Sequence, residues 1–277
     1  MAEAAPSRGT AEAPIPSPNL LWTLAEGYRA GVEAATLVGA SPLLSNLPRG
    51  DGHPLLVLPG FMASDQSTSI LRRWLGRLGY PAHPWTFGRN LGPRGDLIER
   101  MLRRARELVD AHGRPLSIVG QSLGGIYARE IARQAPELVR QVISLGSPFG
   151  ALEGGGTNAG VARLFETSTG KTREQLADEG LFGDTLVPPP VPSTAIFSKT
   201  DGIAHWRACI ERDSPTTDNV EIVGSHCGMG FNPVVLWVVA DRLCQAEGTW
   251  RRFARDGMRS YVVPPPVFAP SPAFAGA

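Results

Sequence analysis

The chain has 277 residues, 42% of them hydrophobic and 19% charged, and this length favours one large domain with appendages. The 27 lysines and arginines are balanced by 26 acidic residues, which argues against a dedicated nucleic-acid-binding protein, a class that is usually strongly basic. No apolar run approaches the roughly 18 residues that a membrane-spanning helix needs, so we expect no such segment.

Both ends of the chain differ in composition from the middle. Residues 1–18 are rich in Ala, Pro and Ser, and residues 261–277 are rich in Pro, so we predict disordered segments on either side of a folded domain at 19–260. The first residues lack the basic and apolar regions of a secretory signal, which predicts a cytoplasmic location. The chain has three cysteines, too few for a disulfide framework.

The first predicted element is a helix from Asn19, a good capping residue, to about residue 38. Its apolar side chains recur every four residues and share one face: Leu20, Leu24, Tyr28 and Val32. We expect this face to pack on the domain, and contact with a membrane surface is the alternative.

From residue 54 onward, short apolar runs alternate with helical patterns, and this order predicts an α/β fold with a mostly parallel sheet covered by helices on both faces. The predicted strands are 54–58, 80–87 as an edge strand, 116–119, 139–145, 193–197 and 220–223. The predicted helices are 69–78, 97–112 with Asp96 as its cap, 123–135 and 233–245. Functional sites in such sheets lie beyond the carboxyl ends of the strands.

One of these strand ends carries a candidate nucleophile. Residues 120–125 read GQSLGG, a G-x-S-x-G pattern between a predicted strand and a predicted helix. In this setting the serine, Ser122, occupies a sharp turn that exposes its hydroxyl, and the small neighbours Gly120 and Gly124 leave room for the turn. The N–H of Leu123, at the start of the helix, is a candidate donor to an oxyanion.

A serine hydroxyl needs a base to become a good nucleophile. Of the five histidines, His226 follows a predicted strand late in the chain, in the order serine, acid, histidine that this architecture uses. We therefore predict His226 as the general base and assign a smaller prospect to His205. The predicted acid is Asp201, which lies just past the strand at 193–197 and before a glycine; its competitors are Asp178, Asp184, Asp213 and Asp218.

The loop after the first strand, Leu58-Pro59-Gly60-Phe61-Met62, is expected to supply a second oxyanion donor. Gly60 allows the backbone to turn close to a substrate, and the N–H of Phe61 is the predicted donor. If the turn differs by one residue, the N–H of Met62 takes this place.

Three motifs resemble the α/β-hydrolase family, specifically its lipase and esterase branch: LPGF at 58–61, GQSLGG at 120–125, and KTDG at 199–202 with GSHCGMGFNP at 224–233. The LPGF loop is similar to the HG-x loop of small bacterial lipases, with Pro59 in place of a histidine that is not catalytic. The resemblance implies the α/β-hydrolase fold and hydrolysis through an acyl-enzyme without a cofactor. It also implies that residues 149–192 form an inserted cap or lid above Ser122; a passive surface excursion is the alternative.

Other cofactor patterns are incomplete. The GKT at 170–172 lacks the glycine that a phosphate-binding loop needs at position 165, where Phe165 stands. A zinc site is suggested by His205, Cys209, His226 and Cys227, but these residues contain no C-x-x-C pair. We therefore expect neither a nucleotide nor a metal cofactor.

The sequence thus predicts a serine hydrolase that cleaves a small-molecule or lipid ester, with Ser122, Asp201 and His226 as catalytic residues and Phe61 and Leu123 at the oxyanion hole. Two alternatives stay open: an acyltransferase that uses the same acyl-enzyme, and a non-catalytic binding protein on the hydrolase scaffold. Nine arginines but only two acids lie between residues 72 and 106. We interpret them as solvated helix faces, and peripheral contact with an anionic membrane surface is the alternative.

Overall fold

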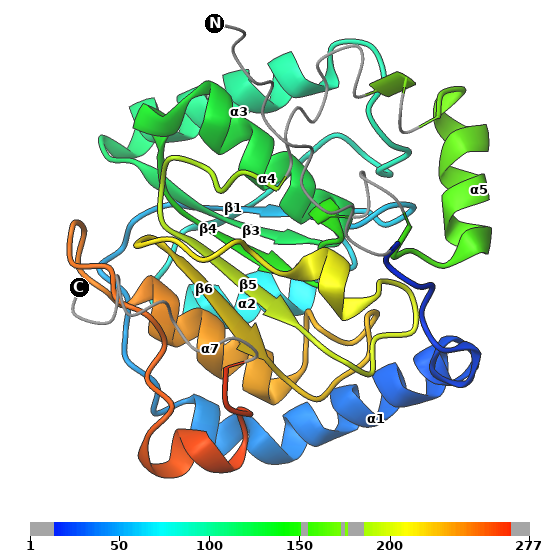
Figure 1. Cartoon of the computed structure of the whole chain (residues 1–277). Helices are drawn as coiled ribbons and strands as arrows, with labels where there is room; N and C mark the ends of the chain where they lie inside the picture. The colour runs from blue at the N-terminus through cyan, green and yellow to red at the C-terminus, as the bar shows by residue number, and fades with distance from the viewer. Residues whose placement is uncertain (1–13, 151–154, 173–174, 177–185, 267–277) are drawn as a thin grey trace, which may run out of the picture.

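The computed structural model describes residues 14–150, 155–172, 175–176 and 186–266, which form a central six-stranded sheet flanked by helices (Figure 1). All neighbouring strands pair in parallel, in the order β2-β1-β3-β4-β5-β6. The strands are β1 (Leu55–Leu58), β2 (Ala82–Pro84), β3 (Leu116–Gln121), β4 (Val139–Leu145), β5 (Ser193–Phe197) and β6 (Thr217–Glu221).

Helices cover both faces of this sheet. In Figure 1, α3 and α4 lie on one face, α2 and α7 on the other, and α1 runs outside α7. The α-helices are α1 (Leu20–Leu44), α2 (Ser69–Arg77), α3 (Leu97–His112), α4 (Leu123–Gln134), α5 (Ala159–Thr169) and α7 (Pro233–Leu243); the 3-10 helices are η1 (Pro136–Leu138), η3 (Trp206–Cys209) and η4 (Gly257–Tyr261). The predicted α/β class, with its covered parallel sheet, is confirmed.

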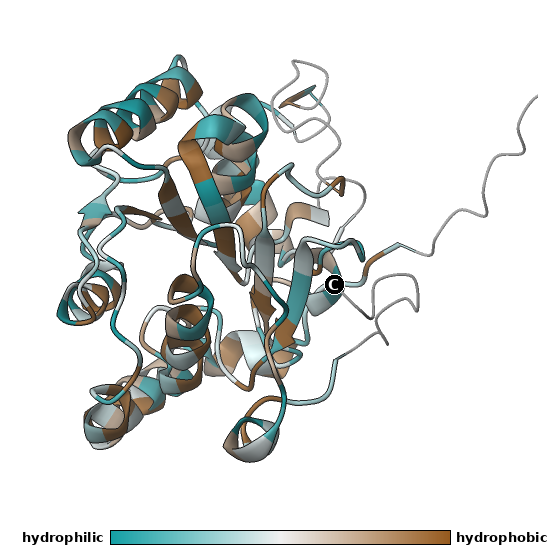
Figure 2. Ribbon diagram, turned by 90° about the vertical axis from the view of Figure 1, so that its left-hand side faces the viewer, coloured by the Kyte–Doolittle hydropathy of each residue, from teal (hydrophilic) through white to brown (hydrophobic). Residues whose placement is uncertain are grey.

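Successive strand residues enter two separate apolar layers, which explains why the strands read as unbroken apolar runs. Ile118 and Val142 pack against α3 and α4, whereas their chain neighbours Val119 and Ile143 pack against α2 and α7. Figure 2 shows the hydrophobic colour concentrated on the strands, while the surrounding helices alternate between hydrophobic and hydrophilic. Because both faces are buried, the sheet can serve as a rigid support for loops at its carboxyl edge.

Most predicted elements match, and the differences have local causes. β4 and β5 have the predicted bounds, and β2 is the edge strand expected from its prolines. β6 begins at Thr217, three residues before the predicted start, because polar residues there are satisfied: the Thr217 hydroxyl donates to the carbonyl of Arg212. Asp96 precedes α3 as predicted, but its side chain caps no backbone N–H.

The orientation predicted for α1 is wrong. Asn19 caps the helix as expected, but Leu20, Leu24, Tyr28 and Val32 are 67%, 75%, 79% and 47% exposed. The opposite face, which carries the charged side chains of the helix, lies against the loops at the carboxyl edge of the sheet, where those charges find hydrogen-bond partners. None of the described helices combines the length and apolar character needed to cross a membrane.

The two ends are more closely attached than the composition predicts. Residues 1–13 and 267–277 lie outside the described residues, but within the predicted disordered segments Ile15 pairs with Gly155 and Val263 is buried in the apolar layer of α2 and α7. The predicted boundaries at 18 and 261 therefore fall inside the folded part.

The predicted insertion, 149–192, contains α5, which stands beside the carboxyl edge of the sheet (Figure 1). The ring of Phe165 on α5 meets the ring of Phe61 edge-on, with centroids 5.4 Å apart. The Ser168 hydroxyl donates to the carbonyl of Leu91 at 2.8 Å. Through the contact between Phe165 and Phe61, α5 lies against the loop that follows β1. The remaining residues of the insertion, 151–154, 173–174 and 177–185, lie outside the described part.

Candidate active site

Ser122 occupies the turn between β3 and α4 in a backbone conformation that few residues adopt. Its φ of 52° and ψ of −121° lie in a region that costs a non-glycine residue free energy. The turn is nevertheless held firmly, because the N–H of Ser122 donates to the carbonyl of Leu145 on the neighbouring strand at 2.8 Å. This strained strand-to-helix turn is the geometry that the G-x-S-x-G pattern predicts.

The flanking glycines make the turn sterically possible. A Cβ atom on Gly120 would lie 2.3 Å from the carbonyl oxygen of Gly124, and a Cβ on Gly124 would lie 2.4 Å from that of Leu58. Both distances are far below van der Waals contact, and both partners are backbone atoms. The residue types around Ser122 are therefore dictated by the packing of α4 against β1 and β3.

Asp201 and His226 form a buried hydrogen-bonded pair at the same edge of the sheet. Oδ2 of Asp201 lies 2.7 Å from Nδ1 of His226, while Oδ1 accepts from the N–H groups of Ile203 and Ala204 at 2.8 and 2.7 Å. Burial lowers the pKa of His226, but the charge and hydrogen bond of Asp201 and the charge of Glu26 raise it, and the pKa lies above its ordinary value. The imidazole is thus oriented with Nε2 left for other chemistry.

The turn of Ser122 and the loop of His226 are joined through Gln121. Its side-chain Nε2 donates to the carbonyl of His226 at 3.1 Å. Within the described part of the chain, the Ser122 hydroxyl itself makes no hydrogen bond to His226. Catalytic hydrogen bonds of this kind often tighten only when substrate binds. The geometry is therefore compatible with Ser122 and His226 acting together on one substrate.

In the loop after β1, only one of the two N–H groups considered as oxyanion donors is free among the described residues. The N–H of Met62 donates to the carbonyl of Asn90 at 2.7 Å, which removes it as an oxyanion donor. The N–H of Phe61 and that of Leu123 make no hydrogen bond within the described residues. Gly60 brings this loop against the turn, since a Cβ placed on it would lie 3.2 Å from the Cβ of Ser122.

The other candidate histidines are engaged elsewhere. His53 bonds Asp51 and Ser117. His83 and His112 bond each other, and the His205 side chain caps η3. None of these four contacts the Asp201–His226 pair through a hydrogen bond.

The competing acids are equally accounted for. Asp213 pairs with Arg252, and Asp218 accepts from the N–H of Phe253. Asp178 and Asp184 lie outside the described residues.

Comparison with known proteins adds the fold family. No protein-family model matches the chain. Among solved structures, the monoacylglycerol lipase of Paleococcus ferrophilus superposes with a TM-score of 0.52 at 12% identity, over 70% of this chain and 96% of that one. An alpha/beta superfamily hydrolase from Oenococcus oeni gives a TM-score of 0.50 at 15% identity, over 69% and 91% of the two chains.

The chain has the α/β-hydrolase fold. In sequence, the chain is similar to a triacylglycerol lipase from Burkholderia plantarii, with 27% identity over 139 residues. That match covers 46% of this chain and 38% of the lipase, so the two correspond over little more than a third of the relative's length.

Three residues that organise the candidate site carry no signal in the sequence. Asn90 is fully buried; its side chain donates to the carbonyl of Pro59 at 2.9 Å and so supports the loop of Phe61. Gln121 supports the His226 loop, as described above. Glu26, on α1, accepts hydrogen bonds from backbone groups of both the acid and the histidine loops. Each acts on backbone groups far away in the chain.

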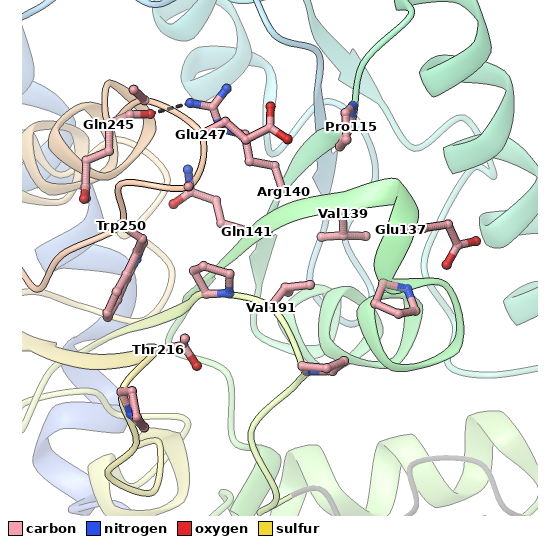
Figure 3. A pocket seen from close by; sticks show the side chains of 16 residues that line it. Pro115, Glu137, Val139, Arg140, Gln141, Val191, Thr216, Gln245, Glu247 and Trp250 are labelled. Atoms are coloured by element: carbon pink, nitrogen blue, oxygen red, sulfur yellow. Dashed lines mark hydrogen bonds between the residues drawn. The ribbon is translucent and has the colours of Figure 1, made fainter. Parts of the chain in front are cut away.

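The structure also has a cavity of about 430 Å³ at the opposite edge of the sheet (Figure 3). Pro115, Val139 and Thr216, which line it, lie at the amino ends of β3, β4 and β6. Arg140 donates to the carbonyl of Gln245 across its rim (Figure 3). Because reaction sites in such sheets lie at the carboxyl edge, this cavity is separate from the candidate active site.

Among the described residues, the thiols and potential metal ligands are not assembled into a further centre. The three cysteines, Cys209, Cys227 and Cys244, are free, and Cys209 is buried. Among the residues that the structure describes, no three or more His, Cys, Asp or Glu side chains are grouped so that they could hold a metal ion.

Proposed function

We propose that the chain hydrolyses carboxylic esters through an acyl-enzyme on Ser122. His226 takes the proton of the Ser122 hydroxyl as its oxygen attacks the ester carbonyl carbon, and the N–H groups of Phe61 and Leu123 stabilise the resulting oxyanion. His226 then donates that proton to the leaving alcohol and activates a water molecule, which releases the acid. Asp201 holds the imidazole tautomer and stabilises the imidazolium.

The observation that carries this proposal is the position of a strained serine at the same sheet edge as a buried Asp–His pair. The serine turn and the pair come from three separate loops, after β3, β5 and β6, and Gln121 connects the first to the last. The lipase relative and the hydrolase fold support an ester as substrate. A binding protein on this scaffold would gain nothing from the backbone strain at Ser122.

The decisive test is hydrolysis of p-nitrophenyl butyrate by the purified protein and by Ser122→Ala. The variant is expected to lose activity by about a thousandfold or more, because the nucleophile is gone. Ser260→Ala, at an exposed serine of η4, serves as the matched control and is expected to keep full activity. Equal activity of Ser122→Ala and the control, or no labelling of Ser122 by a fluorophosphonate probe, would refute the proposal.

The acyl acceptor is proposed to be water. An acyltransferase would form the same acyl-enzyme, and the two differ only in how well the site excludes water. Product analysis with a competing alcohol in excess separates them: free acid as the main product supports hydrolysis, and a new ester as the main product supports acyl transfer.

We further propose that α5, which lies within the predicted insertion, caps the acyl side of the site. Phe165 lies edge-on against Phe61, whose N–H is the proposed oxyanion donor. Phe165→Ala is therefore expected to change the ratio of rates on octanoate and acetate esters. An unchanged ratio would show that α5 does not contact the acyl chain of the substrate.

A further inference from the structure

α1 turns its polar face toward the body of the protein, although the helix is predominantly apolar. Its charged side chains are Glu26, Arg29 and Glu33, and all three reach loops at the carboxyl edge of the sheet. The leucines of its first turns point outward, as Leu21 and Leu24 do at 73% and 75% exposure. In Figure 1 the first turns of α1 lie at the side of the molecule where β5 and β6 end. Apolar burial therefore does not explain how this part of α1 is seated.

Glu26 is buried, at 5% exposure, and its two carboxylate oxygens accept from three backbone N–H groups. Oε1 accepts from Gly202 at 2.9 Å and from His226 at 3.1 Å. Oε2 accepts from Cys227 at 3.0 Å. Gly202 directly follows Asp201, so one carboxylate bonds the loop of the proposed acid and the loop of the proposed base.

Further contacts seat the same turns of α1 on the acid loop. The Thr23 hydroxyl donates to the carbonyl of Gly202 at 2.6 Å, and the Arg29 guanidinium donates to the carbonyl and hydroxyl of Thr200 at 2.5 and 2.7 Å. A Cβ atom on Gly202 would lie 2.5 Å from the backbone of Trp22. The helix approaches this loop so closely that only glycine fits at position 202.

We propose that Glu26 is a positioning residue, which holds the Asp201 loop and the His226 loop in register through a single carboxylate. This inference rests on the proposed function of Asp201 and His226. In the proposed reaction, Glu26 contacts neither the substrate nor the reacting atoms. The two loops follow different strands, β5 and β6, and 25 residues separate Asp201 from His226 along the chain. The Asp201–His226 hydrogen bond orients the ring, and Glu26 fixes the backbone on both sides of that bond.

The electrostatic surroundings give this role a measurable signature. The charged groups that face His226 are Asp201 from the loop after β5 and Glu26 from α1; Glu33 bonds the N–H of the preceding Ser225 at 2.6 Å, and Arg29 lies 3.8 Å from Glu26. The charge of Glu26 raises the pKa of His226, after the opposing effect of burial and the larger effect of Asp201. Removing that charge therefore lowers the pKa of the imidazole.

The test compares Glu26→Gln and Glu26→Asp with the unmodified chain on p-nitrophenyl butyrate between pH 5 and pH 9. Glutamine keeps one acceptor oxygen, replaces the other by a donor that faces an N–H, and removes the charge. Glu26→Gln is expected to lose kcat by about tenfold to a hundredfold with little change in KM. The acid limb of its kcat/KM profile is expected to move to lower pH. Glu26→Asp, which keeps the charge, should restore the position of that limb and part of kcat.

Two matched variants separate this role from a general effect on folding. Glu107→Gln removes an exposed carboxylate on α3 and is expected to behave like the unmodified chain. Glu33→Gln removes the neighbouring half-buried carboxylate, which bonds Ser225 but not His226, and is expected to leave the acid limb in place. An equal shift of the limb in Glu33→Gln, or unchanged kcat and an unmoved limb in folded Glu26→Gln, would overturn the proposal. If Glu26→Gln does not fold, an unaltered kcat in Glu26→Asp overturns it.

A second readout keeps this inference distinct from the proposed function. NMR titration of the histidine ring protons, with His226→Gln used for assignment, measures the imidazole without any substrate. The His226 midpoint is expected at lower pH in Glu26→Gln than in the unmodified chain. If Ser122→Ala shows that ester hydrolysis does not depend on Ser122, the proposed function fails, while the titration still decides whether Glu26 acts on His226; an unmoved midpoint refutes that action.

Discussion

Gln121 donates a hydrogen bond from its side chain to the carbonyl of His226, across 105 residues of sequence. This bond joins the residue before the candidate nucleophile to the candidate base. Glu26 makes the corresponding link between the loops of the acid and the base. Three loops that leave the sheet separately are thus connected by two side chains that have no chemical role of their own in the proposed reaction.

Replacing Gln121 tests the first of these links. Gln121→Ala is expected to lower kcat by about tenfold, because the His226 carbonyl loses its donor and the loop can shift relative to Ser122. Gln121 is uncharged, so the acid limb of the pH profile should stay in place. Steady-state kinetics checks both expectations, with Gln66→Ala at an exposed position as control. Unchanged kcat in Gln121→Ala would show that the link is dispensable.

Replacing Asp201 by asparagine tests the orientation of His226. The amide places a donor or a weaker acceptor opposite Nδ1, which disfavours the required tautomer and the imidazolium. We expect kcat to fall by about 10³- to 10⁴-fold while the protein stays folded. Asp213→Asn, at an aspartate paired with Arg252 on the surface, is the matched control. A loss of less than tenfold in Asp201→Asn would assign the acid role elsewhere.

The dependence of activity on pH follows from the raised pKa of His226. A general base works only when neutral, so kcat/KM rises as the pH passes through the imidazole pKa. Burial lowers this pKa, but Asp201 and then Glu26 raise it further, which places the midpoint above 6.5, the ordinary histidine value. A profile of kcat/KM from pH 5 to pH 9 measures it. A midpoint below 6.5 would contradict the electrostatic picture of the site.

The turn around Ser122 is predicted to tolerate no side chain at Gly124. A Cβ there would lie 2.4 Å from the carbonyl oxygen of Leu58, so Gly124→Ala must displace α4 or β1. We expect a loss of about 1–3 kcal/mol in the free energy of unfolding, together with loss of esterase activity. Gly76→Ala, on α2 with no atom within 4 Å of the added methyl group, is expected to be neutral or slightly stabilising. Urea denaturation compares the two; equal stabilities would be inconsistent with the packing described.

The buried ion pair between Arg129 on α4 and Glu211 is expected to matter for stability. Both side chains are almost fully buried, burial lowers the pKa of Arg129 to about 10, and Ser193 donates to the same carboxylate at 2.6 Å. Glu211→Gln removes the buried carboxylate that pairs with Arg129 and accepts from Ser193, and should cost about 3–5 kcal/mol in the free energy of unfolding. Glu137→Gln, which breaks an exposed pair with Arg106, should cost less than about 1 kcal/mol. Similar losses in both variants would contradict this difference.

The sheet and the serine turn could be predicted because their signals are local. β4 and β5 are unbroken apolar runs bounded by loops, and such runs suit strands buried on both faces. Gly120 and Gly124 flank Ser122 because atoms only a few residues away, or on the adjacent strand, leave no room for a Cβ. Position along the chain then selects Asp201 and His226 as the residues that follow later strands.

The orientation of α1 could not be predicted in this way. Its four-residue apolar repeat favours burial of Leu20 and Leu24, but the structure exposes them and buries Glu26. A hydrophobic pattern indicates the free energy that a helix gains by burial against an apolar partner. It contains no information about backbone N–H groups elsewhere in the chain that a carboxylate can satisfy. Those groups belong to residues about 200 positions away, such as Gly202 and His226.

The amino-acid sequence by itself determined the order of strands and helices, the strained turn at Ser122 and the edge of the sheet where chemistry is expected, since each depends on neighbours in the chain or on the general geometry of parallel sheets. Only the tertiary structure decided that Asn90, Gln121 and Glu26 support the loops of this edge. Their partners are backbone groups 31, 105 and 200 residues away. Backbone N–H and C=O groups are alike in nearly all residue types, so the sequence does not indicate which of them a side chain will bond.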